Sequence, residues 1–132
     1  MKILVDIGHP AHVHYFKNYY SVMKSLGHEF IIFARDREFI FALLNQYGMP
    51  FISRGRGSKS ILGKIGYLIY VVPKMFIRCL RFRPDVVIGF SSVYSSIVAF
   101  LYQAKNIVLD DTEHAKFEQM LYKPFATVIF WR

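Results

Sequence analysis

Cysteine and acidic residues are scarce in this sequence. Its single cysteine, Cys79, excludes an intramolecular disulfide and a zinc site built from several cysteines, and it is typical of a protein from a reducing cytosol. Only 9 Asp and Glu stand against 17 Lys and Arg, which gives a formal net charge of +8 at pH 7. This excess, with a pI of about 9.7, favours anionic partners: phosphorylated metabolites, nucleic acid or an anionic membrane surface.

The sequence also lacks a hydrophobic run long enough to span a membrane. The longest helical pattern, Ile61–Phe82, is interrupted by cations, and its longest uncharged run, Ile65–Pro73, is far shorter than the roughly 20 residues that a spanning helix needs. We predict a crossover helix buried against a sheet; the alternative, suggested by its aromatic residues and cations, is a helix lying on an anionic membrane surface. We expect no cleavable signal peptide, because the apolar stretch Ile3–Ile7 ends in Gly-His-Pro.

Apolar residues are abundant: they make up 54% of the 132 residues, against 20% charged. This excludes a disordered chain, and the length fits a single domain, 1–132. Short apolar runs predict strands at Lys2–Ile7, His28–Ala34, Pro50–Ser53, Val86–Phe90, Asn106–Leu109 and Ala126–Trp131. Helical spacing predicts helices at Ala11–Leu26, at Phe39–Tyr47 after an N-cap candidate at Arg35-Asp36, at Ile61–Phe82, from Ser91-Ser92 to Tyr102, and after Asp110 to about Leu121.

Strands and helices alternate along the chain. This predicts an α/β fold with a mainly parallel sheet: a Rossmann-like, doubly wound domain of strand order 3-2-1-4-5, to which the last segment could add a sixth strand. Only Arg132 follows that segment, whereas a parallel strand normally continues into a crossover helix. We therefore expect either a truncated chain or an edge strand, and favour truncation.

Three histidines follow the first predicted strand: His9, His12 and His14. Pro10 suits the first turn of a helix, in which His12 and His14 would lie about 200° apart and could not bind one metal ion, although His9 and His12 could share a face. We expect no metal centre. Ligands of open α/β sheets bind outside the carboxyl ends of the strands. His9 or His12 could take a proton from an acceptor hydroxyl there, or serve only the structure.

Further polar residues follow the fifth predicted strand: Asp110, Asp111, Glu113 and His114. Asp111 could simply cap the next helix, where anionic residues are favoured. The alternative is a role in orienting a sugar hydroxyl or assisting a histidine, since these side chains exceed what a cap needs. With strand order 3-2-1-4-5 the first and fourth strands are neighbours, so we expect His9, Ser91 and Asp111 to cluster.

The sequence has no Gly-x-Gly-x-x-Gly fingerprint for a dinucleotide. Two weaker candidates could bind phosphate. Ser91 and Ser92 could offer the N–H groups of a helix start or merely cap that helix. The basic loop Arg54–Lys59, which includes Arg56, could bind phosphate or be a solvated loop. No recognised DNA- or RNA-binding motif is present, and we expect no nucleic-acid partner.

The opening segment Lys2–Asn18, KILVDIGHPAHVHYFKN, resembles the start of a prokaryotic family, domain of unknown function 354. The likeness continues at Gly27–Glu29, Ala34–Asp36 and Asp110–Lys116, in the family's order. That family resembles the GT-B superfamily, in which glycosyltransferases and the non-hydrolysing UDP-N-acetylglucosamine epimerases place two Rossmann-like domains across a cleft. One departure lies at Ser91–Ser95, where relatives often have a Pro-containing turn.

The resemblance implies that the chain is the N-terminal, acceptor-side half of such an enzyme, without the second half that carries most of the nucleotide-sugar site. The implied function is a glycosyltransferase of cell-envelope polysaccharide or glycolipid synthesis. The alternatives are a UDP-sugar epimerase or hydrolase of the same fold, and a non-catalytic binding remnant. His9 and Asp111 are the expected catalytic residues. The expected substrate-binding residues are His12, Ser91, Ser92, Glu113, His114, Arg54 and Arg56.

The expected partners are a nucleotide sugar, bound mainly by the second half, and a sugar or lipid-linked acceptor. We expect no cofactor, and no turnover by the isolated chain. The expected location is the cytoplasm, with peripheral attachment to the anionic inner face of the plasma membrane through the loop Arg54–Lys59 and the helix Ile61–Phe82.

Overall fold

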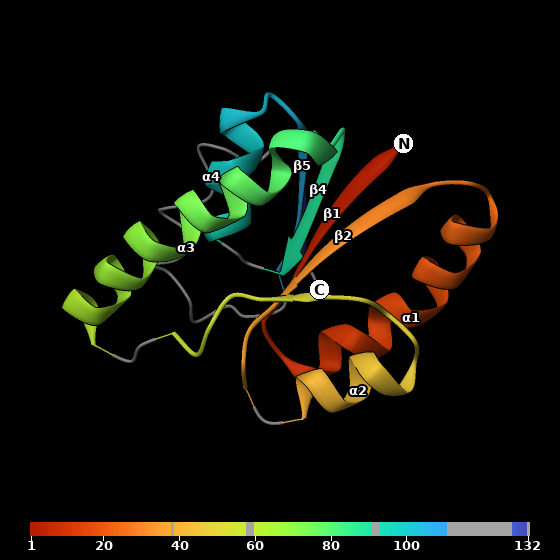
Figure 1. Cartoon of the computed structure of the whole chain (residues 1–132), viewed down its shortest axis with the longest axis horizontal. Helices are drawn as coiled ribbons and strands as arrows, with labels where there is room; N and C mark the ends of the chain where they lie inside the picture. The colour runs from red at the N-terminus through yellow and green to blue at the C-terminus, as the bar shows by residue number, and fades with distance from the viewer. Residues whose placement is uncertain (38, 58–59, 91–92, 111–127, 132) are drawn as a thin grey trace.

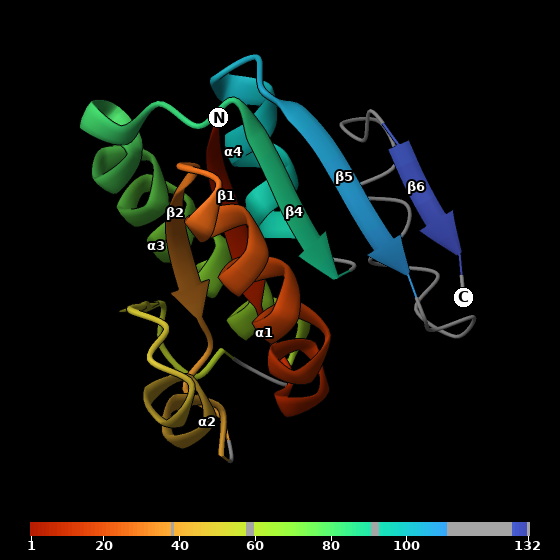
Figure 2. The same ribbon diagram turned by 90° about the vertical axis from the view of Figure 1, so that its right-hand side faces the viewer.

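A computed structural model describes residues 1–37, 39–57, 60–90, 93–110 and 128–131. The described strands form one six-stranded sheet with helices on both faces (Figure 1, Figure 2). The strands are β1 (Lys2–Ile7), β2 (Glu29–Ala34), β3 (Ile52–Ser53), β4 (Val86–Phe90), β5 (Lys105–Asp110) and β6 (Val128–Trp131). The helices are α1 (Pro10–Ser25), α2 (Ile40–Gln46), α3 (Ile61–Phe82) and α4 (Val93–Leu101).

All strand pairs of the sheet are parallel, and the strand order is β3-β2-β1-β4-β5-β6. This confirms the predicted α/β class and the order 3-2-1-4-5, and the last segment supplies the sixth strand. The chain builds outward from β1 in one direction through β2 and β3, then returns to the other side of β1 with β4. The order therefore reverses between β1 and β4, which is the point where open α/β sheets bind ligands.

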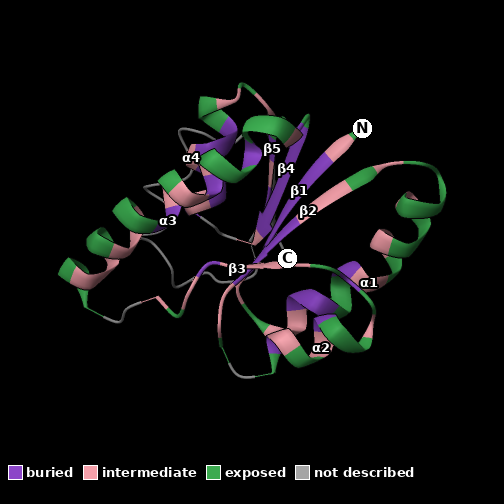
Figure 3. Cartoon of the chain, in the orientation of Figure 1, coloured by how far each residue is buried: buried purple, intermediate pink, exposed green. Residues whose placement is uncertain are grey.

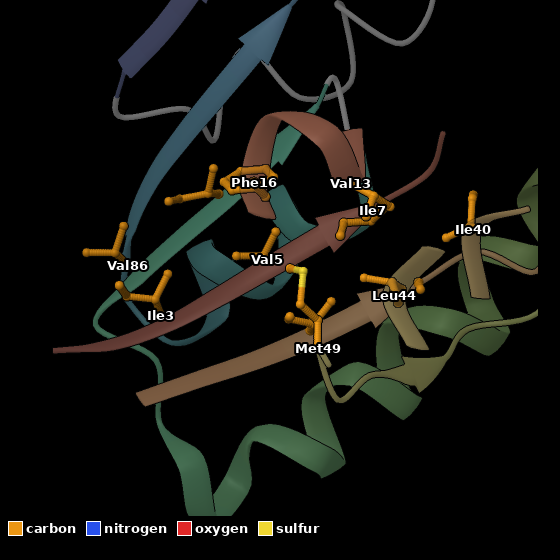
Figure 4. Packing of buried hydrophobic residues seen from close by; sticks show 12 residues of the cluster. Ile3, Val5, Ile7, Val13, Phe16, Ile40, Leu44, Met49 and Val86 are labelled. Atoms are coloured by element: carbon orange, nitrogen blue, oxygen red, sulfur yellow. The ribbon is translucent and has the colours of Figure 1, made fainter. Parts of the chain in front are cut away.

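The first of two cores lies between the sheet and the helices α1 and α2. Because side chains alternate along a strand, Ile3, Val5 and Ile7 of β1 all point to this side. Figure 4 shows them packed against buried residues of both helices. These helix residues are Val13, Phe16, Ile40 and Leu44.

The second core lies on the other face, where Leu4 and Phe33 pack against α3 and α4. The helix residues of this cluster are Val71, Met75, Cys79, Val98 and Ala99. Burial raises the pKa of the Cys79 thiol to about 12, so the single cysteine is an unreactive core residue. The crossover helix α3 is buried along this face only, and exposed residues follow its outer side (Figure 3).

Several element boundaries differ by one or two residues from the sequence prediction, and the differences at α2 and β3 have a physical reason. The N-cap predicted at Arg35-Asp36 is wrong: α2 begins at Ile40, its N-cap residue is Phe39, and no side chain caps it. The backbone N–H of Asp36 instead donates to the carbonyl oxygen of Gly55 (2.9 Å), which holds this segment beside the loop after β3. The strand predicted at Pro50–Ser53 is only Ile52–Ser53; Pro50 has no N–H to contribute to a ladder. The helix predicted up to Leu121 lies outside the described residues.

Candidate functional site

The site lies at the carboxyl edge of the sheet, where β1 and β4 end side by side. Asp6 of β1 is in register with Gly89 of β4, so Ile7 and Phe90 end their strands together. Gly8 and His9 follow β1 and lead directly into α1. The loop after the first strand and the end of the fourth therefore meet at the topological switch point, as the sequence predicted.

His9 is the N-cap residue of α1. Its backbone is extended, and its imidazole Nδ1 accepts a hydrogen bond from the backbone N–H of Ala11 (3.1 Å). Pro10 occupies the first turn, where a missing N–H costs nothing. Because Nδ1 accepts this hydrogen bond, the proton of the neutral imidazole is on Nε2, and this exposed side chain presents an N–H donor at the edge of the sheet.

His12 lies one helical turn later and is almost fully buried. Its ring stacks on Phe90, with the centroids 3.8 Å apart and the planes 7° from parallel. Its Nδ1 accepts a hydrogen bond from the backbone N–H of Gly8 (3.3 Å), so the proton is again on Nε2. Burial is the main reason that the pKa of His12 falls from 6.5 to about 3, and nearby cations add to the shift. His12 is therefore a neutral hydrogen-bond donor at physiological pH.

The imidazoles of His9 and His12 lie side by side, with ring centroids 5.7 Å apart. Neither Nε2 has a hydrogen-bond acceptor among the described residues. His14 lies elsewhere, with its ring edge against Tyr47 (6.0 Å), as helical geometry predicts. No group of three or more histidine, cysteine or acidic side chains in the described part of the chain is placed to hold a metal ion.

Behind this edge, Asp6 and Arg54 form a buried ion pair. The Arg54 Nε donates to Asp6 Oδ1 at 2.7 Å, and the two side chains are 5% and 1% exposed. Burial alone would lower the pKa of the Arg54 guanidinium, but the charge of Asp6 and the hydroxyl of Tyr67 raise it above its ordinary value. Of the two readings that the sequence left open for this basic loop, solvation is excluded for Arg54.

Aromatic side chains and the backbone enclose the rest of the Arg54 guanidinium. Its Nη1 donates to the hydroxyl oxygen of Tyr67 (2.9 Å), and that hydroxyl donates to the Arg54 carbonyl oxygen (2.6 Å). The Tyr94 ring lies over the guanidinium at 5.0 Å. A Cβ at Gly8 would meet Nη2 at 3.2 Å, so the loop that begins with Gly8 passes close above this cation.

Other arginines follow β2 and β3 at the same edge. The exposed Arg56 lies 3.4 Å from Asp36, and Arg35 donates from Nε to the Arg56 carbonyl oxygen (2.6 Å). Sequence reasoning selected Arg56 but missed Arg35, Asp6 and the tyrosines around Arg54. The signal for Asp6 was available: a carboxylate inside an otherwise apolar strand needs a buried partner.

Several predicted site residues lie outside the described part of the chain: Ser91, Ser92, Asp111, Glu113 and His114. The strands that precede them are described, however. β4 ends at Phe90 and β5 at Asp110, with Phe90 in register with Leu109. The predicted clustering of His9, Ser91 and Asp111 thus remains a prediction, whose strand adjacency is confirmed.

Comparison with known protein families assigns the chain to one of them. A family model matches residues 1–131, nearly the whole sequence. The chain belongs to the DUF354 family. This family is described as a protein of unknown function, and the match confirms the resemblance seen in the sequence. None of the curated proteins matches the sequence of this DUF354 chain.

Solved structures similar to this DUF354 chain include glycosyltransferases and a UDP-GlcNAc 2-epimerase. MurG of Acinetobacter baumannii gives a TM-score of 0.77 at 13% identity, over 99% of this chain and 41% of its own. UDP-GlcNAc 2-epimerase of Methanocaldococcus jannaschii gives 0.72 at 12%, over 99% and 39%. The Streptomyces sp. SF2575 glycosyltransferase SsfS6 gives 0.66 at 17%, over 83% and 39%. The fold is therefore that of the GT-B proteins, and the chain spans about two fifths of each of these three structures.

Replacing Asp6 tests the buried ion pair. We expect Asp6→Asn to lower the free energy of unfolding by about 3–5 kcal/mol, because it leaves the Arg54 charge buried without its partner. The matched control is Asp36→Asn, which breaks the exposed pair with Arg56 (side chains 44% and 85% exposed) and should cost less than about 1 kcal/mol. Urea unfolding measures both. Equal effects of the two substitutions would contradict the assignment.

The burial of His12 predicts a pH-dependent stability. Unfolded His12 binds a proton below about pH 6.5, whereas the folded imidazole stays neutral down to about pH 3. Between these values the unfolded chain binds more protons, so lowering the pH from about 6.5 toward 3 should reduce the free energy of unfolding by about 1.4 kcal/mol per pH unit from this residue. The free energy of unfolding, measured with urea at several pH values, should change with pH more steeply in the wild type than in His12→Gln, by this amount. Titration of the His12 ring in NMR spectra near pH 6.5 would refute the prediction.

Proposed function

We propose that this chain is the acceptor-side domain of a GT-B-like glycosyltransferase that uses a nucleotide-sugar donor. The observation that carries the proposal is the pair of imidazoles, His9 and His12, which lie side by side at the switch point and whose Nε2 atoms have no hydrogen-bond partner among the described residues. Such N–H groups can donate hydrogen bonds to the oxygen atoms of sugar hydroxyl groups. The likeness to SsfS6, also solved in complex with thymidine diphosphate, supports the donor class.

In this proposal a hydroxyl oxygen of the acceptor bonds to the anomeric carbon of the donor sugar, and the bond from that carbon to the diphosphate oxygen breaks. The nucleoside diphosphate leaves, and the hydroxyl proton passes to a base. His9 and His12 orient the hydroxyl, because their Nδ1 atoms are occupied and their Nε2 atoms carry protons. His9 could act as the base only by moving its proton to Nδ1, which would break the cap on α1.

The base is then Asp111, the acidic residue directly after β5, which lies outside the described residues. Glu113 and His114 would assist in binding, as would Ser91 and Ser92 after β4. Arginines at the carboxyl edge would favour the approach of an anionic substrate; among them, the exposed Arg56 can contact it directly, whereas Arg54 acts from beneath the loop.

The second candidate function is a UDP-sugar epimerase or hydrolase. It is favoured by the likeness to UDP-GlcNAc 2-epimerase, which covers the same 99% of this chain as the likeness to MurG. In either case the donor would bind mainly to a second domain across a cleft, and the 132-residue chain alone should be inactive. Holding the reactants together can supply about 7–11 kcal/mol of the barrier, which one wall of a cleft cannot do.

We place the proposed reaction in cell-envelope polysaccharide or glycolipid synthesis, with a sugar or lipid-linked acceptor. The location would be the cytoplasm, at the inner face of the plasma membrane. The net charge of +8 supports this setting, since the lipids of that face are anionic.

The proposal is tested by supplying UDP-sugars to the two-domain protein, with and without a membrane extract as a source of acceptor. A transferase forms its glycosylated product only when the extract is present. Conversion of the UDP-sugar without any acceptor would establish the epimerase or hydrolase instead. The absence of turnover under both conditions, in a folded protein that binds the nucleotide, would leave the non-catalytic binding remnant.

Substitutions at the two predicted catalytic residues separate their roles. We expect Asp111→Asn to lower kcat by about 10²–10⁴-fold, because it removes the base. His9→Asn should lower kcat while leaving the thermal stability near that of the wild type, since an Asn side chain still caps α1. Steady-state kinetics and thermal unfolding measure both effects. Unchanged kcat in both variants would rule out this site.

A further inference from the structure

The outer face of α3 carries a stripe of large hydrophobic side chains in contact with solvent. While Val71, Met75 and Cys79 face the core, seven other residues of the helix are exposed, Leu62 by 84%. They are Ile61, Leu62, Ile65, Ile69, Tyr70, Ile77 and Leu80, the outer stripe. Large hydrophobic side chains exposed together on one helix mark a binding surface.

The charge along the same helix has one sign. Residues 61–82 contain no Asp or Glu, but four cations: Lys64, Lys74, Arg78 and Arg81. Arg78 and Arg81 are exposed, while Lys74 donates from Nζ to the Ser53 carbonyl oxygen (2.7 Å). Hydrophobic side chains beside cations suit an anionic lipid surface, where the apolar groups enter the interface and the cations meet the headgroups.

The position of α3 relates this stripe to the candidate site. The helix begins just after the carboxyl edge of the sheet, at the Ser60 cap, and its first turns project beyond the sheet (Figure 1). The most exposed residues, Ile61 and Leu62, are in these turns. None of the described helices is long and apolar enough to cross a bilayer. We therefore consider contact between the membrane and the side of this helix.

We propose that the outer stripe of α3 docks in the plane of an anionic lipid bilayer and brings the carboxyl edge of the sheet to its surface. The occupant is the bilayer rather than a protein because the helix that carries the stripe has no acidic residue and carries two exposed cations, Arg78 and Arg81. The delivery of a lipid-linked acceptor to His9 rests on the proposed function; the docking itself does not. Arg54 is buried and is not part of the docking surface.

Vesicle flotation of the full 132-residue chain tests the docking, with no nucleotide sugar present. The chain should float with vesicles that contain phosphatidylglycerol and remain free with pure phosphatidylcholine. Raising the salt from about 0.1 M to about 1 M shortens the Debye length from about 10 Å to about 3 Å and should release it. Equal binding to neutral and anionic vesicles, or binding unaffected by salt, would overturn the proposal.

A matched pair of substitutions locates the docking surface. Ile69 in the stripe and Leu26 at the end of α1, on the opposite side of the sheet, are each 67% exposed. Ile69→Glu should weaken binding to anionic vesicles by about tenfold or more, whereas Leu26→Glu, which adds the same charge, should leave most of the binding intact. Equal loss in both variants, or no loss with Ile69→Glu, would overturn the assignment to α3.

Sedimentation of the same variants tests whether another copy of the chain covers the stripe instead. One result is a wild type that is a dimer and does not bind lipid, with Ile69→Glu a monomer. This result would overturn the docking to a bilayer and show that a second copy of the chain covers the stripe. Because the flotation assay needs no catalysis, its failure would leave the proposed glycosyl transfer standing, and a failure of the sugar assay would leave the docking standing.

Discussion

The carboxylate of Asp6 is buried inside β1, and the need to neutralise it determines much of what surrounds the carboxyl edge. Its partner, Arg54, comes from the loop after β3 and reaches across β2 to the central strand. The same guanidinium bonds Tyr67, which fixes the start of α3, and lies against Gly8, which begins the loop to α1. One ion pair thus joins three segments that converge on the candidate site, and it leaves neither charge free in the core.

Next to that ion pair, hydrogen bonds to the backbone and ring packing determine which nitrogen of His9 and of His12 carries the proton. The backbone N–H groups of Ala11 and Gly8 occupy the Nδ1 atoms of His9 and His12, and the Phe90 ring shields His12 from water. Both imidazoles therefore present Nε2–H donors rather than bases. Two N–H donors suit a polar, uncharged ligand such as a sugar hydroxyl. The general base must then come from other residues, and the acidic residues after β5 are the proposed source.

The sequence predicted the fold and the position of the site because both follow from periodicity. Apolar runs separated by helical segments determine a parallel sheet, and the carboxyl ends of its strands must then meet at one edge. The adjacency of β1 and β4, and with it the meeting of His12 and Phe90, follows from the strand order. The burial of Arg54 did not follow, since Gly-rich basic loops are usually solvated and its partner is 48 residues away. For α3 the sequence left two alternatives open, a helix buried against the sheet and a helix with an exposed face, because an apolar helix does not reveal which of its sides another element covers.

The central claim is that the edge between β1 and β4 presents two imidazoles whose Nδ1 atoms accept backbone hydrogen bonds and whose protons are on Nε2. Long-range ¹H–¹⁵N correlation NMR of the chain with ¹⁵N-labelled histidine measures this directly, because it distinguishes a protonated from an unprotonated ring nitrogen. At neutral pH the account predicts an unprotonated Nδ1 and a protonated Nε2 in both His9 and His12. A proton on Nδ1 of either ring, or a positively charged His12, would contradict it.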